Sequence, residues 1–190
     1  MKTKLIKDRF VIIKKYVTGK DVLDVGCAGC PYNPKKVPFD IIKANAKSYW
    51  GLDIRKSKDP KILHGDAETT NLNKKFDVIV AGDIIEHLSN QGLFLENMKK
   101  HLRPGGKLII STPNIRSRWI FSPTNPEHVL WHSKQTFLQL FKRHNYQVVE
   151  FYYYFGNKKL FFLFELFKEI FYRLIRPMTE SMMIIIEDKK

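Results

Sequence analysis

The chain has 190 residues, 44% of them hydrophobic, which is enough for one well-packed domain and too few for two. Its 33 lysines and arginines outnumber 19 acidic residues, so the net charge is +14. A basic surface attracts nucleic acids, acidic lipid headgroups and phosphorylated molecules, but these lysines are scattered along the chain and form no block. The charge therefore selects no partner by itself.

Two cysteines are present, Cys27 and Cys30, and they form one C-x-x-C pair. A zinc site needs two more ligands at suitable spacing, and there is no second C-x-x-C pair, so we predict no metal site. The sequence has no disulfide framework, no signal-peptide pattern at its start and no apolar run of about 18 residues. We therefore expect a cytoplasmic protein without a spanning helix.

Hydrophobic periodicity predicts helices and strands in alternation. A stripe from Leu5 to Val17 predicts a helix over residues 3–17, and a buried run predicts a strand over 21–25. The elements expected after them are a helix at 36–46, strands at 49–53, 61–64 and 76–81, a helix at 90–102, a strand at 107–111, a helix at 133–143, a strand at 146–154, a helix at 158–175 and a strand at 181–187. Such alternation predicts a parallel sheet covered by helices on both faces, with ligands bound outside the carboxyl ends of the strands.

Small and acidic residues follow four of the predicted strands. The first strand runs into five small residues, 26–30, which we call the cradle loop because they let backbone N–H groups approach a ligand closely. Asp53 ends the second strand, Asp66 follows the third, and Gly82 and Asp83 follow the fourth. Four strand ends therefore offer groups that a nucleoside-containing ligand could use.

Each acidic side chain has a ligand-binding interpretation and a structural one. Asp53 can accept hydrogen bonds from two vicinal ribose hydroxyls, or it can cap a turn. Asp66 can accept from an exocyclic adenine amine, with the Ala67 N–H at the ring edge, or it can cap the short turn before Glu68. Asp24, inside a buried strand, requires backbone N–H partners in the cradle loop or an ammonium group of a ligand.

Three motifs together resemble those of class I S-adenosylmethionine-dependent methyltransferases, over about residues 20–150. Residues 22–30 (VLDVGCAGC) are similar to the first motif of that family, residues 102–108 (LRPGGKL) to its L-x-P-G-G motif, and residues 83–88 (DIIEHL) to the E-H-L signature of its small-molecule branch. The resemblance implies an α/β fold with a Rossmann-like, doubly wound, seven-stranded and mostly parallel sheet, helices on both faces and an antiparallel last strand. It implies a single domain over 1–190, with an N-terminal helix (1–19), a cofactor-binding half (20–114) and a substrate-side half (115–190).

The same resemblance implies S-adenosylmethionine as the cofactor. Asp53 and Ile54 would hold the ribose and adenine, Asp66 and Ala67 the adenine edge, and the Gly82–Asp83 backbone the methionine portion. The full set of implied cofactor-binding residues is Asp24, Gly26, Cys27, Ala28, Asp53, Ile54, Asp66, Ala67, Gly82 and Asp83. Ala28 and Cys30 stand where the family usually has glycines, and a Cβ there narrows the allowed backbone conformations.

Methyl transfer is an in-line displacement, so the enzyme mainly positions the acceptor and, for a hydroxyl or ammonium acceptor, removes a proton. The candidate bases are Asp83, Glu86 and His87 after the fourth strand, and His128 and His132 in segment 125–133. Glu86 and His87 can equally brace the next helix, and His128 can equally pack within its own loop. By resemblance, segment 125–133 closes over the active site. Ser133 is expected to be the N-cap of the helix that follows.

The late segment 158–176 is strongly aromatic, with an apolar stripe wider than a surface helix normally buries. A lid, a dimer face, a peripheral membrane contact and simple packing on the sheet all stay open for it.

The function that we expect is methyl transfer to a small-molecule acceptor, which could be lipid-like or glycan-linked. The alternatives are a basic nucleic-acid-binding or RNA-methylating protein, and a silent partner module that binds the cofactor. Nucleic acid is disfavoured because Gly82–Ile85 replaces the Asp/Asn-Pro-Pro-aromatic motif of base-amine methylation, and both cysteines lie in the cradle loop instead of near an acceptor.

Overall fold

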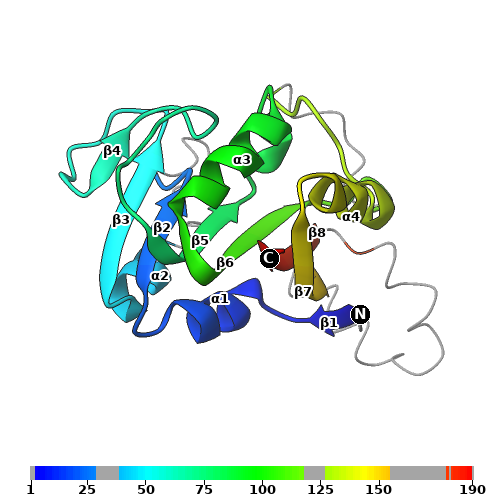
Figure 1. The fold of residues 1–190 in the computed structure, drawn as a ribbon. Helices are drawn as coiled ribbons and strands as arrows, with labels where there is room; N and C mark the ends of the chain where they lie inside the picture. The colour runs from blue at the N-terminus through cyan, green and yellow to red at the C-terminus, as the bar shows by residue number, and fades with distance from the viewer. Residues whose placement is uncertain (1–2, 29–38, 118–126, 155–178, 180, 190) are drawn as a thin grey trace.

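Eight strands form one mixed sheet in the order β1-β7-β8-β6-β5-β2-β3-β4 (Figure 1). The structure is a computed structural model, and it describes residues 3–28, 39–117, 127–154, 179 and 181–189. The strands are β1 (Thr3–Ile6), β2 (Asp21–Val25), β3 (Ser48–Asp53), β4 (Ile62–His64), β5 (Phe76–Gly82), β6 (Leu102–Pro113), β7 (Tyr146–Tyr154) and β8 (Ser181–Asp188). The helices are α1 (Arg9–Val17), α2 (Phe39–Asn45), α3 (Gln91–His101) and α4 (Lys134–Arg143), with a 3₁₀ turn, η2 (Ile85–His87).

The described helices cover both faces of the sheet. Phe94 of α3 and Phe137 of α4 belong to one buried cluster, whereas Ile13 of α1 and Ile42 of α2 belong to the other. Figure 1 shows the two pairs of helices on opposite sides of the strands. All neighbouring strands are parallel except β8, which runs antiparallel to both β6 and β7. The predicted doubly wound α/β fold with an antiparallel last strand is confirmed.

The sheet has eight strands, so the predicted number of seven is wrong by one. The periodicity predicts residues 3–6 as the first turns of a helix, but they form the edge strand β1 beside β7. The helix begins only at Arg9, because the Asp8 side chain accepts a hydrogen bond from the Phe10 N–H at 2.8 Å and caps it. The apolar residues Leu5 and Ile6 fit either periodicity, and the free edge of β7 decides between them.

Other boundaries differ by a few residues. β6 begins at Leu102, ahead of the predicted start at 107, and α2 begins at Phe39. The predicted helix at 158–175 lies outside the described residues. None of the helices in the described ranges is long and apolar enough to cross a membrane.

Candidate active site

The described part of the cradle loop follows β2 with a turn that needs glycine. Gly26 has a positive φ of 76°, and its N–H donates to the Leu52 carbonyl oxygen at 2.8 Å. A Cβ at this position would lie 3.5 Å from Ile84, which is ordinary contact, so the backbone conformation rather than space requires glycine. Gly29 and Cys30 lie outside the described residues. The turn ties the ends of β2 and β3 together.

Asp53 is buried at the end of β3 and links the cradle loop to its own turn. One carboxylate oxygen accepts from the Ala28 N–H at 2.7 Å, and the other accepts from the Arg55 N–H at 2.8 Å. The turn-capping interpretation is therefore correct. It does not exclude hydrogen bonds from a ligand, because each carboxylate oxygen can accept a second hydrogen bond. Ile54 follows with 69% of its surface exposed, an unusual position for a large aliphatic side chain beside a polar strand end.

Asp24 lies in the middle of β2, fully surrounded by protein. The Tyr49 hydroxyl donates to its Oδ2 at 3.5 Å, and within the described ranges no backbone N–H reaches the carboxyl group. Burial, above all, raises the pKa of Asp24 to about 8. The expected backbone partners from the cradle loop are not found among the residues described, so the protonated form is the stable one at neutral pH.

Cys27 is buried against β3. Its sulfur lies so close to Gly51 that a Cβ at Gly51 would be 2.4 Å from Sγ. Burial is the largest cause that raises the pKa of the thiol to about 12, with the nearby Asp24 adding to it. A buried thiol with this pKa is inert, which agrees with its interpretation as a small packing residue of the loop.

Asp66 caps its own turn. Oδ1 accepts from the Glu68 N–H at 2.8 Å, and the backbone oxygen accepts from the Thr70 N–H at 2.8 Å. Ala67 is buried, and its carbonyl oxygen accepts from Asn97 Nδ2 at 3.1 Å. The capping alternative for Asp66 is confirmed, and its contact with an adenine amine stays a prediction.

Asp83 comes directly after β5 with a left-handed φ of 54° and belongs to an ion-pair cluster. Its carboxylate pairs with Arg9 of α1 and accepts from Ser111 Oγ at 2.9 Å. Arg9 also donates to Ser111 Oγ at 2.8 Å and to the Tyr154 hydroxyl at 2.9 Å. Burial disfavours the charged guanidinium, but Tyr154 and Asp83 outweigh it, so the pKa of Arg9 is raised.

Sequence reasoning missed Arg9. It is the first residue of a helix that comes from the other end of the domain, and its neighbours in sequence carry no motif. The signal that could have found it is the Asp-Arg pair at the start of an otherwise lysine-rich amphipathic stripe. Asp83 is bound by two partners, so it is poorly placed as a base, and its catalytic assignment stays a prediction.

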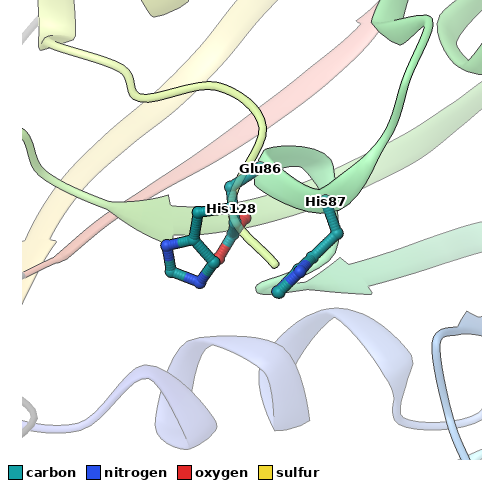
Figure 2. A group of neighbouring side chains, drawn as sticks. All are labelled: Glu86, His87 and His128. Atoms are coloured by element: carbon teal, nitrogen blue, oxygen red, sulfur yellow. The ribbon is translucent and has the colours of Figure 1, made fainter. Parts of the chain in front are cut away.

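Three candidate catalytic side chains gather beyond β5: Glu86, His87 and His128 (Figure 2). Glu86 is 1% exposed, and neither of its carboxylate oxygens has a hydrogen-bond donor among the described residues. The buried Thr112 hydroxyl lies near Glu86 and lowers its pKa, although the contact lacks ordinary hydrogen-bond geometry. Burial, followed by the charge of Asp83, raises the pKa of Glu86 well above its usual range.

Segment 127–131 packs on η2 through its backbone. The Glu86 carbonyl oxygen accepts from the Val129 N–H at 2.8 Å and from the Leu130 N–H at 3.2 Å. The His87 and His128 rings meet edge to face with centroids 4.7 Å apart, and His128 contacts Trp131 in the same way. Burial, with His87 next, lowers the pKa of His128, so its imidazole is neutral at pH 7.

His132 lies apart from this group. It packs on Phe137, and its ring nitrogens, which have no hydrogen-bond partner in the described chain, are buried. Its carbonyl oxygen accepts from the Ile115 N–H at 2.9 Å, which joins the two loops. Ser133 is the N-cap of α4, as predicted, because its hydroxyl accepts from the Thr136 N–H.

These strand ends, the cradle loop and the histidine pair occupy one end of the sheet, and comparison with known proteins explains the arrangement. A family model described as a methyltransferase domain matches residues 4–151. The chain is a member of the class I S-adenosylmethionine-dependent methyltransferases. The predicted family and cofactor are confirmed.

Two known proteins resemble this methyltransferase over 66% and 94% of its length. A ubiquinone biosynthesis O-methyltransferase of Rickettsia canadensis is 27% identical over 135 residues, which cover 66% of this chain and 54% of the relative. The chain spans about half the length of the curated relatives it matches. A methyltransferase structure from Archaeoglobus fulgidus superposes with a TM-score of 0.72 at 17% identity, covering 94% of this chain and 90% of that one.

The fold also matches the N-methyltransferase NodS of Bradyrhizobium japonicum, solved in complex with S-adenosyl-L-homocysteine. The TM-score is 0.62 at 14% identity, and the match covers 96% of this methyltransferase and 85% of NodS. An O-methyltransferase among the sequence relatives and an N-methyltransferase among the structural neighbours share this fold, so the fold leaves the acceptor atom open.

Proposed function

We propose that this protein transfers the methyl group of S-adenosylmethionine to a small-molecule acceptor. The observation that carries the proposal is the junction of the cradle loop with Asp53, where Gly26 turns the chain back and Ala28 donates to the carboxylate. This junction fixes an acceptor-only group beside exposed backbone at the ends of β2 and β3, which suits a nucleoside with two ribose hydroxyls.

The remaining cofactor contacts follow from the same end of the sheet. Exposed Ile54 offers an apolar surface to a purine ring. The Gly82–Asp83 backbone and the Arg9 guanidinium lie where the methionine portion would extend, and a guanidinium suits its carboxylate. When bound, the cofactor supplies an electrophilic methyl group on a sulfonium.

Exposed aliphatic side chains favour an apolar acceptor. Val129 is 58% exposed and Leu130 is 43% exposed, and Ile115 stands in the loop that pairs with their segment. An apolar rim of this kind fits a lipid-like acceptor, in agreement with the ubiquinone-pathway name of one relative. Glu86 and His128 are the proposed proton acceptors, because both lie beyond β5 and His128 is neutral.

We keep the assignment of one domain over 1–190, with a cofactor-binding half (20–114) and a substrate-side half (115–190). The support is that the proposed cofactor contacts lie at the ends of β2, β3 and β5, while segment 127–131 packs on η2. The contact role of 158–176, at a membrane or in a dimer, and a cytoplasmic location remain predictions.

Calorimetric titration with S-adenosylhomocysteine tests the cofactor site. We expect one molecule bound per chain, and Asp53→Asn to weaken binding by about tenfold or more, because an amide cannot accept from Ala28 and Arg55 at once. Asp59→Asn is the matched control, because among the described residues this carboxylate accepts from Lys43 Nζ and from the Lys61 N–H of its own turn. No binding to the wild-type protein would overturn the proposal.

The acceptor class is tested with labelled S-adenosylmethionine and cell extract. We expect label in the low-molecular-weight organic-soluble fraction. Label found only in RNA would favour the nucleic-acid alternative, and cofactor binding without any transfer would identify a silent binding module.

A further inference from the structure

We propose that Glu86, His87 and His128 form a binding site for one divalent transition-metal ion such as Zn²⁺. The inference reverses our prediction of no metal site, which weighed the cysteine pair and the spacing of His128 and His132 but not the group of Glu86, His87 and His128. It stands on these three residues alone and does not depend on the proposed methyl transfer, because in the metal-bound protein Glu86 and His128 are ligands of the ion and not the proton acceptors.

The three side chains come from two segments that the backbone already holds together. Glu86 and His87 belong to η2. Val129, the residue after His128, donates its N–H to the Glu86 carbonyl oxygen at 2.8 Å. One ligand atom from each residue lies within 4.8 Å of the other two. Ligand atoms around a metal with bonds of about 2.1 Å stand roughly 3.4 Å apart, so a small rotation of the two imidazoles closes the site.

The second observation is the buried carboxylate, which points into this group (Figure 2). Glu86 is 1% exposed, and in the described part of the chain no donor makes a hydrogen bond of ordinary geometry to Oε1 or Oε2, although the Thr112 hydroxyl lies near. A buried polar group without a partner is costly, and buried carboxylates are normally paired or bound to a metal. A cation among these side chains would provide the partner that the protein does not.

The hydrogen bond of His87 leaves the lone pair on its other ring nitrogen available. His87 Nδ1 is 3.1 Å from the Glu127 carbonyl oxygen. Because a carbonyl only accepts, Nδ1 carries the proton and Nε2 of the neutral ring keeps its lone pair for a metal. Asp83, three residues before Glu86, is held by Arg9 and Ser111 and is therefore not counted as a ligand.

The donor set selects the class of metal. Two imidazoles and one carboxylate suit Zn²⁺, Co²⁺ and similar ions, whereas Mg²⁺ and Ca²⁺ prefer oxygen ligands only. Three protein ligands also leave a coordination position open, which is the pattern of catalytic rather than structural zinc sites.

The test is a titration of metal-stripped, untagged full-length protein with Co²⁺, followed by its visible absorbance, and then competition with Zn²⁺. We expect one ion per chain, and a loss of affinity of about tenfold or more in His128→Ala and in His87→Ala. Glu86→Gln should weaken binding in the same way, but it changes a fully buried group, so the two histidine variants decide the result. Circular dichroism establishes that each variant is folded.

Two controls separate this site from other ligands. His144→Ala removes a histidine that pairs with Glu96 elsewhere on the domain, and Cys30→Ser breaks the C-x-x-C pair. Both should bind the metal like the wild type. The proposal is overturned if the wild type binds no Co²⁺ stoichiometrically, if His128→Ala binds as tightly as the wild type, or if Cys30→Ser alone abolishes binding. Titration with S-adenosylhomocysteine in the absence of metal shows separately whether the protein binds the cofactor product.

Discussion

Asp24 shows how a single buried acid can make the stability of this fold depend on pH. It pairs with Gly51 and Val80 in neighbouring strands, and the Tyr49 hydroxyl at 3.5 Å is a weak partner for a charge. Because its pKa is about 8 in the folded protein and near 4 in an unfolded chain, folding favours the protonated acid. The stabilisation is complete below about pH 4 and is lost as the pH rises to 8.

We therefore expect the free energy of unfolding to fall between pH 5 and pH 8, and to fall less in Asp24→Asn. Over this range the free energy of unfolding of the wild type should fall by about 4 kcal/mol more than that of Asp24→Asn. Urea unfolding at three pH values measures it. Glu86 acts in the same direction, so the variant keeps some slope, but parallel curves for the variant and the wild type would contradict the assignment to Asp24.

Gly26 and Gly105 share a φ of 76° but differ in their surroundings. Alanine at either position is strained by about 1 kcal/mol, because an L residue disfavours the left-handed region. A Cβ at Gly105 would have no neighbour within 4 Å in the described chain, whereas Gly26 is in the cradle loop. The two substitutions should thus destabilise the fold similarly and affect the cofactor differently.

Calorimetry with S-adenosylhomocysteine separates the two effects. We expect Gly26→Ala to lower the affinity by about tenfold or more and Gly105→Ala to leave it within about twofold, since only the first alters the loop path. Equal affinities would argue against contact between the cradle loop and the cofactor.

At the scale of elements, α1 is the part of the fold that completes the cofactor end of the sheet. Asp8 caps it, Ile13 and Val17 bury its inner face, and Arg9 reaches the cluster of Asp83, Ser111 and Tyr154. This one side chain links α1 to β5, β6 and β7. The helix therefore contributes to the site, although it precedes the first central strand in the sequence.

We expect Arg9→Ala to lower the free energy of unfolding by about 1–2 kcal/mol, at the lower end for a buried ion pair because Asp83 is partly exposed. Arg103, which pairs with Asp21 and Asp77 at the surface, is the matched control, and Arg103→Ala should cost much less. Thermal unfolding compares the two.

The same variant tests the proposed contact with the methionine carboxylate. Arg9→Ala should lower the affinity for S-adenosylhomocysteine by about tenfold. The affinity for 5′-methylthioadenosine, which lacks the amino acid, should stay nearly unchanged. An equal loss for both ligands would mean that Arg9 acts through the fold and not through the carboxylate.

For the whole molecule, the net charge of +14 and the cofactor site predict different responses to salt. Binding of duplex DNA to a basic surface should fall by orders of magnitude between low and high salt, because it rests on counterion release. Binding of S-adenosylhomocysteine rests on buried and short-range contacts, so its dissociation constant should change by less than about threefold. A cofactor affinity that collapsed with salt would contradict a site at the strand ends.

Local features of this protein could be read from the sequence because near neighbours decide them. The buried run of β2 predicts a central strand, and Ser133 predicts the start of α4. The acids at the strand ends, Asp53 and Asp66, were also correctly placed. Each of these depends on periodicity, turn chemistry or capping within a few residues.

Only the tertiary structure decided the features that join distant segments. Residues 3–6 are a strand because β7 offers a free edge, Arg9 belongs to the site because three strands present oxygens to it, and Glu86 meets His128 because segment 127–131 folds back onto η2. The spacing in sequence, 74 residues between Arg9 and Asp83, carries no trace of such contacts. The sequence by itself thus determined the family, the sheet and the strand ends at which acidic residues gather. The packing of remote segments decided which of these charges are paired and which are left buried, because burial and partner choice depend on the whole fold.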